Sequence, residues 1–582
     1  MAVQNRRTTG TVRRRNHPRR RGAGRVFVFF LVVLLAVAAG MYLTVYGPTR
    51  EKLPLDEYYT FLHDDEAALV INDTYIEPGE EDIGGCALVR NGHLYVERGC
   101  FKDNIDDGYV FDDVERVMRY ATENTLVEVP YDGNLYTVGG ASEDAGAPVV
   151  ISDYEKVYLL TDFAAKYSDF SCTLFKKPYR AVLTGAGFER QVASVKWSAA
   201  VRRLGGPKSK IVKTLRHGAK VSVLKNYGTW SNVVTEDGVV GYVKNRQIGR
   251  AKAVTTKAVL PERQYRHKTL DDEIMLGWHQ VTSKVANAGV DKVLVQDKAL
   301  DVISPTWFYL NDSEGGVADF SAGEYVQHCH NRGVQVWGLI SDFENTQVDE
   351  VSVLNRASRR DRLVNNLISA ALACGMDGIN VDFEKVPTAA ADGYIQFIRE
   401  LSLQCEANDL FLSVDNYVLA SYNSYYNRKV QSDYADYLIV MAYDEHYRGG
   451  EEAGSNASET FVKEGIEATL QEVPRERLVL GMPFYCREWI ETENSLLSRD
   501  LRMRDVPGYL TDHSLKPAWD ESLGQNYVEY KEDGAKHMLW IEDTQSLERK
   551  LSLMKQFELA GGAFWKLGSE TEDVWPVIMK YR

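Results

Sequence analysis

The sequence predicts a multidomain protein whose C-terminal part is a barrel of alternating strands and helices. The chain has 582 residues, more than one hydrophobic core organises, so several domains are expected. From residue 268 onward, strand-like apolar runs alternate with helical stretches such as 362–373 and 394–408. Eight such runs over about 315 residues fit a (β/α)8 TIM barrel. A doubly wound sheet is the alternative on periodicity alone.

The eight expected strands are short apolar runs, several of which end in polar residues. They cover residues 292–295, 302–305, 334–340, 378–383, 410–414, 437–441, 478–482 and 561–565. The alternation stops between about 490 and 536, which indicates an insertion before the last strand.

The N-terminal end differs sharply in charge from the rest of the chain. Residues 1–25 contain nine Arg and no Asp or Glu, so the net charge of −15 becomes −24 for the remainder. The acidic total argues against a nucleic-acid-binding protein. The following 21 residues, Val26–Tyr46, carry no charge and are long enough as a helix to span about 30 Å, the thickness of a bilayer core.

This arrangement predicts a basic cytoplasmic tail over 1–25, a single transmembrane helix over 26–46, and export of the bulk of the chain. The alternative is a cleaved signal peptide and a secreted protein, because Ala36-Val37-Ala38 resembles a small-x-small cleavage site.

Three segments are expected between the anchor and the barrel. Residues 48–66 are polar and turn-rich, typical of a stalk. Residues 67–189 contain short alternating runs separated by Asn-Gly and Asp-Gly turns, which predicts one or more β-rich spacer modules without a reactive site. Residues 190–250 contain five short strands joined by Gly-containing turns, which predicts a small closed barrel.

The small barrel resembles a bacterial SH3 domain. The resemblance rests on the order Val-Arg, Gly-x-x-Val, Trp-x-x-Val and Gly-x-Val-x-Gly-Tyr-Val over residues 201–243. It implies docking to cell-wall peptides. Trp230 and Tyr242 do not by themselves decide between such a role and the core of a small barrel.

Cofactor and metal sites are not expected. No P-loop, dinucleotide fingerprint or nucleophile elbow is present, and His446 has no partner at metal-ligand spacing. The seven Cys are too sparse for a disulfide scaffold and include no Cys-x-x-Cys, although Cys86 and Cys100 could pair in an exported domain.

The strongest chemical signal is the octet Asp-Gly-Ile-Asn-Val-Asp-Phe-Glu at 377–384. Side chains alternate along a strand, so Asn380, Asp382 and Glu384 share one face. Polar groups on the inward face of a packed barrel are costly unless they react or pair. A site at the C-terminal end of this strand is therefore expected.

The octet resembles the Asp-x-x-Asp-x-Asp-x-Glu signature of family 18 glycoside hydrolases, with Asn380 in place of the second Asp. The barrel is similar to the branch that contains spore-cortex-lytic N-acetylglucosaminidases, and the resemblance covers about 315 of the 582 residues. Further motifs agree in order along the chain: Ser304-Pro305-Thr306-Trp307, Met441-Ala442-Tyr443-Asp444, Gly481-Met482-Pro483-Phe484-Tyr485 and Ala563-Phe564-Trp565.

The resemblance implies retaining hydrolysis assisted by the 2-acetamido group of the substrate. Glu384 would be the general acid and then the base, and a nearby anion such as Asp382 would raise its pKa. Asp382 would orient the acetamido N–H and stabilise the oxazolinium intermediate, while Tyr443 would hydrogen-bond the acetamido oxygen. Trp565 would form the apolar floor under the sugar, unless it is plain barrel core.

Asn380 departs from the family pattern because it cannot titrate. Its amide is expected to donate to Asp382 and hold it ionised. Other candidates for substrate binding belong to the octet or lie at or just past strand ends, where each is equally open to a structural role: Asp377, Trp307, Asn416, Tyr417, Asp444, Tyr485 and Arg487.

These features predict a membrane-anchored glycosidase that cleaves β-1,4 bonds of an N-acetylglucosamine-containing wall polymer, peptidoglycan. One alternative is a chitinase-type hydrolase of other N-acetylglucosamine polymers, and another is a non-catalytic carbohydrate-binding wall protein. An acidic exported chain gains little from charge attraction to an anionic wall, so stacking and acetamido contacts are expected to supply the affinity.

Overall fold

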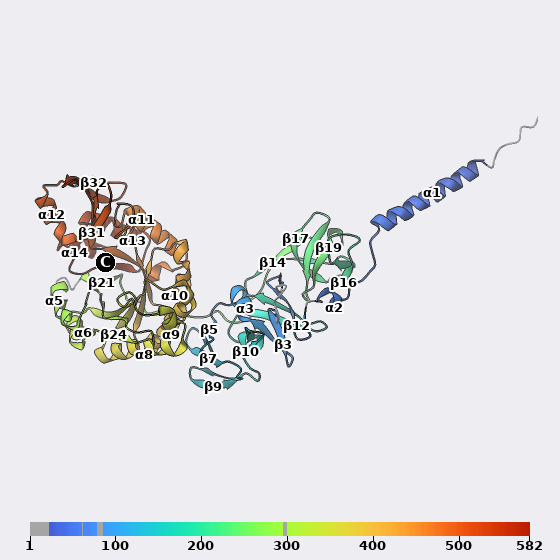
Figure 1. Ribbon diagram of the computed structural model, residues 1–582, viewed down its shortest axis with the longest axis horizontal. Coiled ribbons are helices and arrows are strands. Elements are labelled where there is room, and N and C mark those ends of the chain that lie inside the picture. The colour runs from blue at the N-terminus through green and yellow to red at the C-terminus, as the bar shows by residue number, and fades with distance from the viewer. Residues whose placement is uncertain (1–22, 61, 78–84, 295–298) are drawn as a thin grey trace, which may run out of the picture. The chain divides into compact units, whose positions relative to one another are not determined.

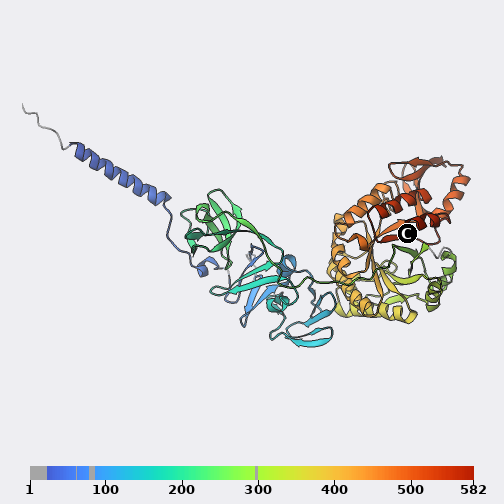
Figure 2. The same ribbon diagram turned by 180° about the vertical axis from the view of Figure 1, so that it is seen from behind.

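The computed structural model describes residues 23–60, 62–77, 85–294 and 299–582, which form two compact units (Figures 1 and 2). One unit combines Met1–Cys100 with Ala164–Val259, and the other combines Phe101–Phe163 with Leu260–Arg582. The expected spacer over 67–189 therefore contributes to both units. All but the last three residues of the expected basic tail lie outside the described residues.

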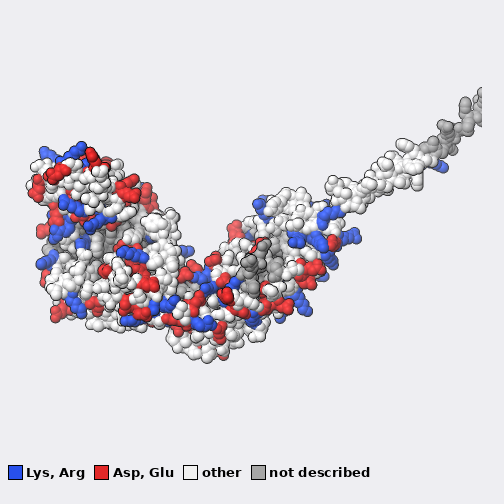
Figure 3. Space-filling view, viewed as in Figure 1, with Lys and Arg blue, Asp and Glu red and all other residues white. Residues whose placement is uncertain are grey.

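The first unit begins with the helix α1, Ala23–Tyr46. Its stretch Arg25–Tyr46 has a mean hydropathy of 2.8 and is long and apolar enough to cross a membrane. None of the side chains in that stretch is buried, and Figure 3 shows the helix free of charged residues along most of its length. A signal sequence meets the same criteria of length and composition, so this segment is either an anchor or a signal sequence.

The rest of the first unit is built from short strands. A four-stranded sheet has the order β12-β13-β1-β2, with β1 pairing parallel to β13. The helix α2 (Leu55–Tyr58) and the hairpin of β3 (Ala87–Arg90) and β4 (His93–Glu97) accompany it. The strands of the sheet are β1 (Ala68–Ile71), β2 (Thr74–Ile76), β12 (Phe170–Phe175) and β13 (Arg180–Gly185).

A seven-stranded antiparallel sheet occupies the region in which the small barrel is expected. Its order is β16-β15-β19-β18-β17-β14-β20. Trp230 and Tyr242 are half-buried at its surface, where Lys244 lies over the Trp230 ring at 5.3 Å. The likeness to an SH3 domain stays a prediction. The strands are β14 (Glu189–Ser194), β15 (Ala199–Arg202), β16 (Ile211–Leu215), β17 (Lys220–Asn226), β18 (Trp230–Thr235), β19 (Val240–Lys244) and β20 (Lys252–Thr255).

The second unit starts with a small β layer that packs on the barrel helices α8 (Ala357–Cys374) and α9 (Ala391–Ala407). The antiparallel sheet runs in chain order from β5 to β9. A hairpin of β10 (Val150–Asp153) and β11 (Lys156–Leu160) follows it. The five strands are β5 (Val110–Asp112), β6 (Val117–Ala121), β7 (Leu126–Pro130), β8 (Leu135–Val138) and β9 (Ala141–Asp144).

The larger part of the second unit is a closed barrel of eight parallel strands, as the sequence predicts. The order is β22-β21-β35-β29-β28-β27-β26-β25, and pairing of β22 with β25 closes the ring. The strands are β21 (Ile274–His279), β22 (Val302–Pro305), β25 (Gln335–Ser341), β26 (Gly378–Asp382), β27 (Phe411–Tyr417), β28 (Tyr437–Met441), β29 (Leu478–Pro483) and β35 (Gly561–Trp565).

The prediction of the first strand at 292–295 is wrong. That strand is β21, and Val290–Val293 forms the short helix α5. Val290 and Val293 are both buried, and their three-residue spacing places them on one helical face. Residues 295–298 lie outside the described residues.

Helices and an inserted sheet surround the barrel. The helices besides α5, α8 and α9 are α6 (Gly323–His330), α7 (Glu350–Leu354), α10 (Arg428–Tyr434), α11 (Glu459–Thr469), α13 (Thr544–Gln556) and α14 (Val574–Ile578). A five-stranded antiparallel sheet with the helix α12 (Val506–Asp512) lies between β29 and β35, where the insertion is expected. Its strands are β30 (Tyr485–Glu491), β31 (Leu496–Arg502), β32 (Ala518–Asp520), β33 (Gln525–Glu532) and β34 (Ala535–Ile541).

Candidate active site

The interior of the barrel changes from apolar to polar along the strands. Buried apolar side chains such as Leu276, Val302, Leu339 and Ile439 fill one layer. A polar layer follows toward the C-terminal ends of the strands, and Asn380 on β26 is at its centre. The C-terminal end of a parallel barrel is where such folds carry their active sites.

Asn380 is fully buried, and its amide is completely hydrogen-bonded. Its Oδ1 accepts from Trp278 Nε1 at 2.9 Å and from Ser304 Oγ at 3.0 Å. Its Nδ2 donates to Asp415 Oδ1 at 2.8 Å and to Ser413 Oγ at 3.0 Å. Because an indole N–H can only donate, the contact with Trp278 fixes which end of the amide faces Asp415.

This network corrects the expected role of Asn380. Its amide donates to Asp415 on the neighbouring strand β27, and not to Asp382. Asp415 is buried and was missed by the sequence reasoning, which selected its neighbours Asn416 and Tyr417. The same two-residue alternation that singled out the octet also places Asp415 and Tyr417 on one face of β27, so the signal was present.

Asp382 is the last residue of β26, and one of its carboxylate oxygens has no hydrogen-bond partner. Its side chain is 7% exposed, and its Oδ1 is buried with no hydrogen-bond partner. Burial raises the pKa of this carboxyl well above its ordinary value, and the negative charges of Glu384 and Asp415 raise it further. A buried acceptor without a donor is costly, so this oxygen is a candidate acceptor for a donor group of a bound ligand.

Glu384 lies just beyond the strand, held from two sides. The N–H groups of Glu384 and Lys385 donate to the two carboxylate oxygens of Asp342 at 3.0 and 2.8 Å. The Tyr417 hydroxyl donates to Glu384 Oε2. Burial raises the pKa of Glu384, while the bond from Tyr417 opposes that rise. Burial also raises the pKa of Asp342 to about 6.

Aromatic residues from three other strand ends complete the cluster. Tyr443 is half-buried, and burial raises the pKa of its hydroxyl, with further increases from the neighbouring Tyr485 and from the three carboxyls of the cluster. Its ring meets the Tyr485 ring edge-on with centroids 6.3 Å apart. Trp565, half-buried at the end of β35, meets the Trp278 ring edge-on at 6.1 Å.

A charged network borders the cluster on the side of the inserted sheet. Asp444 accepts from the Tyr485 hydroxyl at 2.5 Å and from Arg487 Nη2 at 2.9 Å. Arg487 is almost fully buried and also donates from Nε to Asp500 at 3.0 Å. The predicted residues Asp444, Tyr485 and Arg487 therefore form one connected group.

Three predicted residues do not join the cluster. Trp307 is fully buried, with Nε1 donating to Asn287 Oδ1 at 2.7 Å, so it belongs to the core. Asn416 donates to Gln431 Oε1 at 2.8 Å on α10, outside the barrel wall. Asp377 precedes β26, and its carboxylate accepts from the backbone N–H of Val336 at 2.8 Å near the opposite end of the strand.

No group of three or more His, Cys, Asp or Glu among the described residues is placed to hold a metal ion. A hydrogen bond with Cys86 raises the pKa of Cys100, so the two thiols are in contact, and their pairing stays a prediction.

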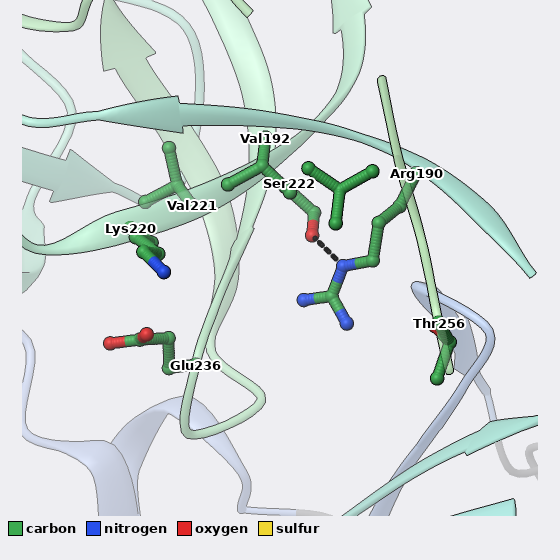
Figure 4. A pocket seen from close by; sticks show the side chains of 8 residues that line it. Arg190, Val192, Lys220, Val221, Ser222, Glu236 and Thr256 are labelled. Carbon is green, nitrogen blue, oxygen red and sulfur yellow. Dashed lines mark hydrogen bonds between the residues drawn. The ribbon is translucent and has the colours of Figure 1, made fainter. Parts of the chain in front are cut away.

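A cavity of about 250 Å³ lies in the first unit (Figure 4). Arg190 and Lys220 bring positive charge to it, and Glu236 brings negative charge. Arg190 Nε donates to Ser222 Oγ at 3.0 Å, and its guanidinium lies 3.5 Å from Asp73. The positive charge of Arg190 is therefore already balanced by Asp73 within the fold.

Comparison with known proteins defines the class to which the barrel belongs. Residues 300–570 match the glycosyl hydrolases family 18. The barrel therefore contains a domain of this glycosidase family, the family that the octet resembles.

Individual relatives include cortex-lytic enzymes. The chain is 24% identical over 283 residues to the uncharacterized glycosylase YvbX of Bacillus subtilis (strain 168), covering 46% of this chain and 81% of that protein. It is 24% identical over 258 residues to the cortical fragment-lytic enzyme of the same organism, covering 41% of this chain and 58% of that enzyme. The crystal structure of the Bacillus cereus spore cortex-lytic enzyme SleL aligns with a TM-score of 0.49 at 18% identity, covering 56% of this chain and 78% of that one.

Proposed function

We propose that this protein is a membrane-anchored glycosidase that cleaves β-1,4 bonds of N-acetylglucosamine in peptidoglycan by a substrate-assisted retaining mechanism. The observation that carries the proposal is the buried Asp382 oxygen without a hydrogen-bond partner, beside Glu384 at the mouth of the barrel. An acetamido N–H is a donor of the kind this oxygen lacks.

Asp382 and Tyr443 would act on the acetamido group. Asp382 accepts its N–H, which turns the acetamido oxygen toward the anomeric carbon, and the Tyr443 hydroxyl hydrogen-bonds that oxygen. As the oxygen attacks, positive charge develops on the oxazolinium ring, and the carboxylate of Asp382 stabilises it. This stabilisation is strong because Asp382 is shielded from water.

Glu384 would move the proton. Burial raises its pKa and so favours the protonated carboxyl, which can protonate the leaving glycosidic oxygen. The resulting carboxylate then removes a proton from the water that opens the oxazolinium. The backbone bonds to Asp342 hold the loop that carries Glu384 during both steps.

The sugar itself would rest on the aromatic residues of the mouth. Trp565 provides an apolar face for the ring, and Tyr485 and Asp444, held by Arg487, provide polar contacts beside it. The visible face in Figure 3 carries interspersed charges of both signs, which supports recognition by stacking and hydrogen bonds and not by a single-sign surface.

The remaining segments would place the barrel near its polymer. The apolar stretch of α1 supports an anchor with the N-terminus in the cytoplasm and the bulk of the chain outside. The order of motifs over residues 201–243, which resembles that of an SH3 domain, supports a wall-docking role for the seven-stranded sheet, where a cell-wall peptide is the expected partner. The cortex-lytic names of the relatives support a wall polymer as the substrate.

The test is to incubate the full-length protein in detergent with purified peptidoglycan and, separately, with chitin oligomers, and to identify new reducing ends by mass spectrometry. We expect N-acetylglucosamine reducing ends from peptidoglycan, lost in Glu384→Gln and retained in Glu451→Gln, whose side chain is exposed. Release from chitin alone would favour a chitinase-type enzyme. Binding without release from either polymer would refute hydrolysis, and insensitivity to a thiazoline that mimics the oxazolinium would refute the substrate-assisted mechanism.

A further inference from the structure

Three carboxylates share the polar layer of the barrel, although the proposed reaction uses only two of them. Asp382 and Glu384 belong to β26 and the loop after it, and Asp415 belongs to the adjacent strand β27. Asp415 is 2% exposed. It forms no ion pair with any residue that the structure describes, so its burial needs another explanation.

The Asn380 amide sets the orientation of Asp415. Trp278 and Ser304 donate to Asn380 Oδ1, which leaves Nδ2 to donate to Asp415 Oδ1 at 2.8 Å. The amide is neutral, so it orients the carboxyl without compensating a negative charge. A protonated Asp415 can accept this bond on Oδ1 and carry its proton on Oδ2.

The titratable groups around Asp415 are acids and phenols. Asp382 faces it from the end of β26 and Glu384 from the loop after that strand, and Tyr443 faces the cluster from the end of β28. Tyr394 of α9 and Asp342 at the end of β25 are also within range of the cluster's charges. The charge of Lys385 acts on the cluster through Glu384, where it opposes the rise in pKa.

Full ionisation of this cluster would place uncompensated negative charges in one dry site. Like charges that share a buried site do not all ionise, so at least one carboxyl keeps a proton beyond that of Glu384. Asp382 has to be the anion when the oxazolinium forms, because its unpartnered Oδ1 is the acceptor that the proposed reaction pairs with the acetamido N–H.

We propose that Asp415 is a positioning residue that holds the retained proton of this cluster, so that Asp382 is ionised when substrate binds. The role of keeping Asp382 ionised rests on the proposed function. The retained proton itself is inferred from the burial of Asp415 and from the hydrogen bond that Asn380 donates to it. Asp415 does not touch the substrate and exchanges no proton with it.

The experiment compares wild type with Asp415→Asn, which keeps an acceptor for Asn380 but has no proton to lose. Infrared spectra of the full-length proteins in detergent are recorded across pH, and the protonated-carboxyl band is compared. We expect wild type at pH 8 to show a buried protonated carboxyl that Asp415→Asn lacks. Asp436→Asn is the matched control: Asp436 is buried at the other end of the barrel with a pKa of about 6, so this variant should lose no band at pH 8.

Activity on peptidoglycan supplies the second readout. We expect Asp415→Asn to keep both limbs of the pH profile in place, since one neutral group replaces another. A shift of both limbs to lower pH would show that Asp415 works as an anion, and it would overturn the proposal, as would an unchanged infrared band. The infrared measurement does not depend on enzymatic activity. An inactive wild type would therefore refute the proposed function, while the infrared spectra would still determine whether Asp415 is protonated.

Discussion

Arg119 is expected to hold the β5–β9 sheet against the barrel. It lies on β6 and is buried. Its guanidinium donates to both oxygens of Asp361 on α8, at 2.7 and 2.8 Å, and to Glu400 on α9 at 3.2 Å. It also donates to Glu128 on β7 at 2.8 Å. Arg119→Met removes these bonds and keeps most of the apolar volume.

The expected loss follows from the exposure of each partner. Asp361 and Glu128 are partly exposed, so each pair is worth at most about 1 kcal/mol. Glu400 is buried but keeps two bonds from Arg360, so the loss of one charged hydrogen bond costs about 1.5 kcal/mol. Together these terms give about 3 kcal/mol, equivalent to roughly a hundredfold change in the opening equilibrium of the sheet.

Hydrogen–deuterium exchange on the full-length protein in detergent measures this opening directly. Amides of β6 and β7 should exchange roughly a hundredfold faster in Arg119→Met. The control is Arg116→Met in the same β layer, because the Arg116–Asp132 pair is about half exposed and should contribute less than about 1 kcal/mol. Equal exchange rates in the two variants would refute the claim that Arg119 stabilises the sheet more than Arg116 because it is buried.

Three further predictions concern the active site. Tyr417→Phe removes the hydrogen bond that lowers the pKa of Glu384, so the basic limb of the kcat/KM profile should move to higher pH; a shift to lower pH would contradict the assignment. Asp342 has a folded-state pKa of about 6 against an ordinary 3.8, so its contribution to stability should be lost as pH rises from about 4 to about 6. Asp342→Asn should flatten that part of the curve of Tm against pH, and an unchanged slope would show that another group dominates. Trp565→Ala should raise KM for peptidoglycan about tenfold or more, whereas Trp307→Phe should leave KM unchanged and lower Tm, because Trp307 is core; a KM effect of Trp307→Phe would reverse that placement.

Much of the barrel was predictable because its signals are local. Seven of the eight strands lie where the apolar runs predict them, and the inserted sheet lies where the alternation breaks. The first strand was predicted wrongly because the apolar run at 292–295 has the composition of a strand. Its first residues belong instead to the helix α5, from which Val290 and Val293 are buried in the core. Composition does not separate a short buried helix from a strand.

The grouping of the β segments was not predictable in the same way. Residues 101–163 read as part of a spacer, yet they form one compact unit with the barrel. Contacts such as those of Arg119 with Asp361 and Glu400 join residues more than 240 positions apart. Local patterns carry no information on such partners.

The sequence by itself determined that Asn380, Asp382 and Glu384 share a face, because alternation along a strand is a property of the backbone alone. The tertiary structure decided which side chains contact that face. Strand pairing brings Asp415 to Asn380, and it turns Asn416 toward α10 and Trp307 into the core. Which strands become neighbours depends on closing the whole barrel, so the partners of the octet emerge only when all eight strands are in place.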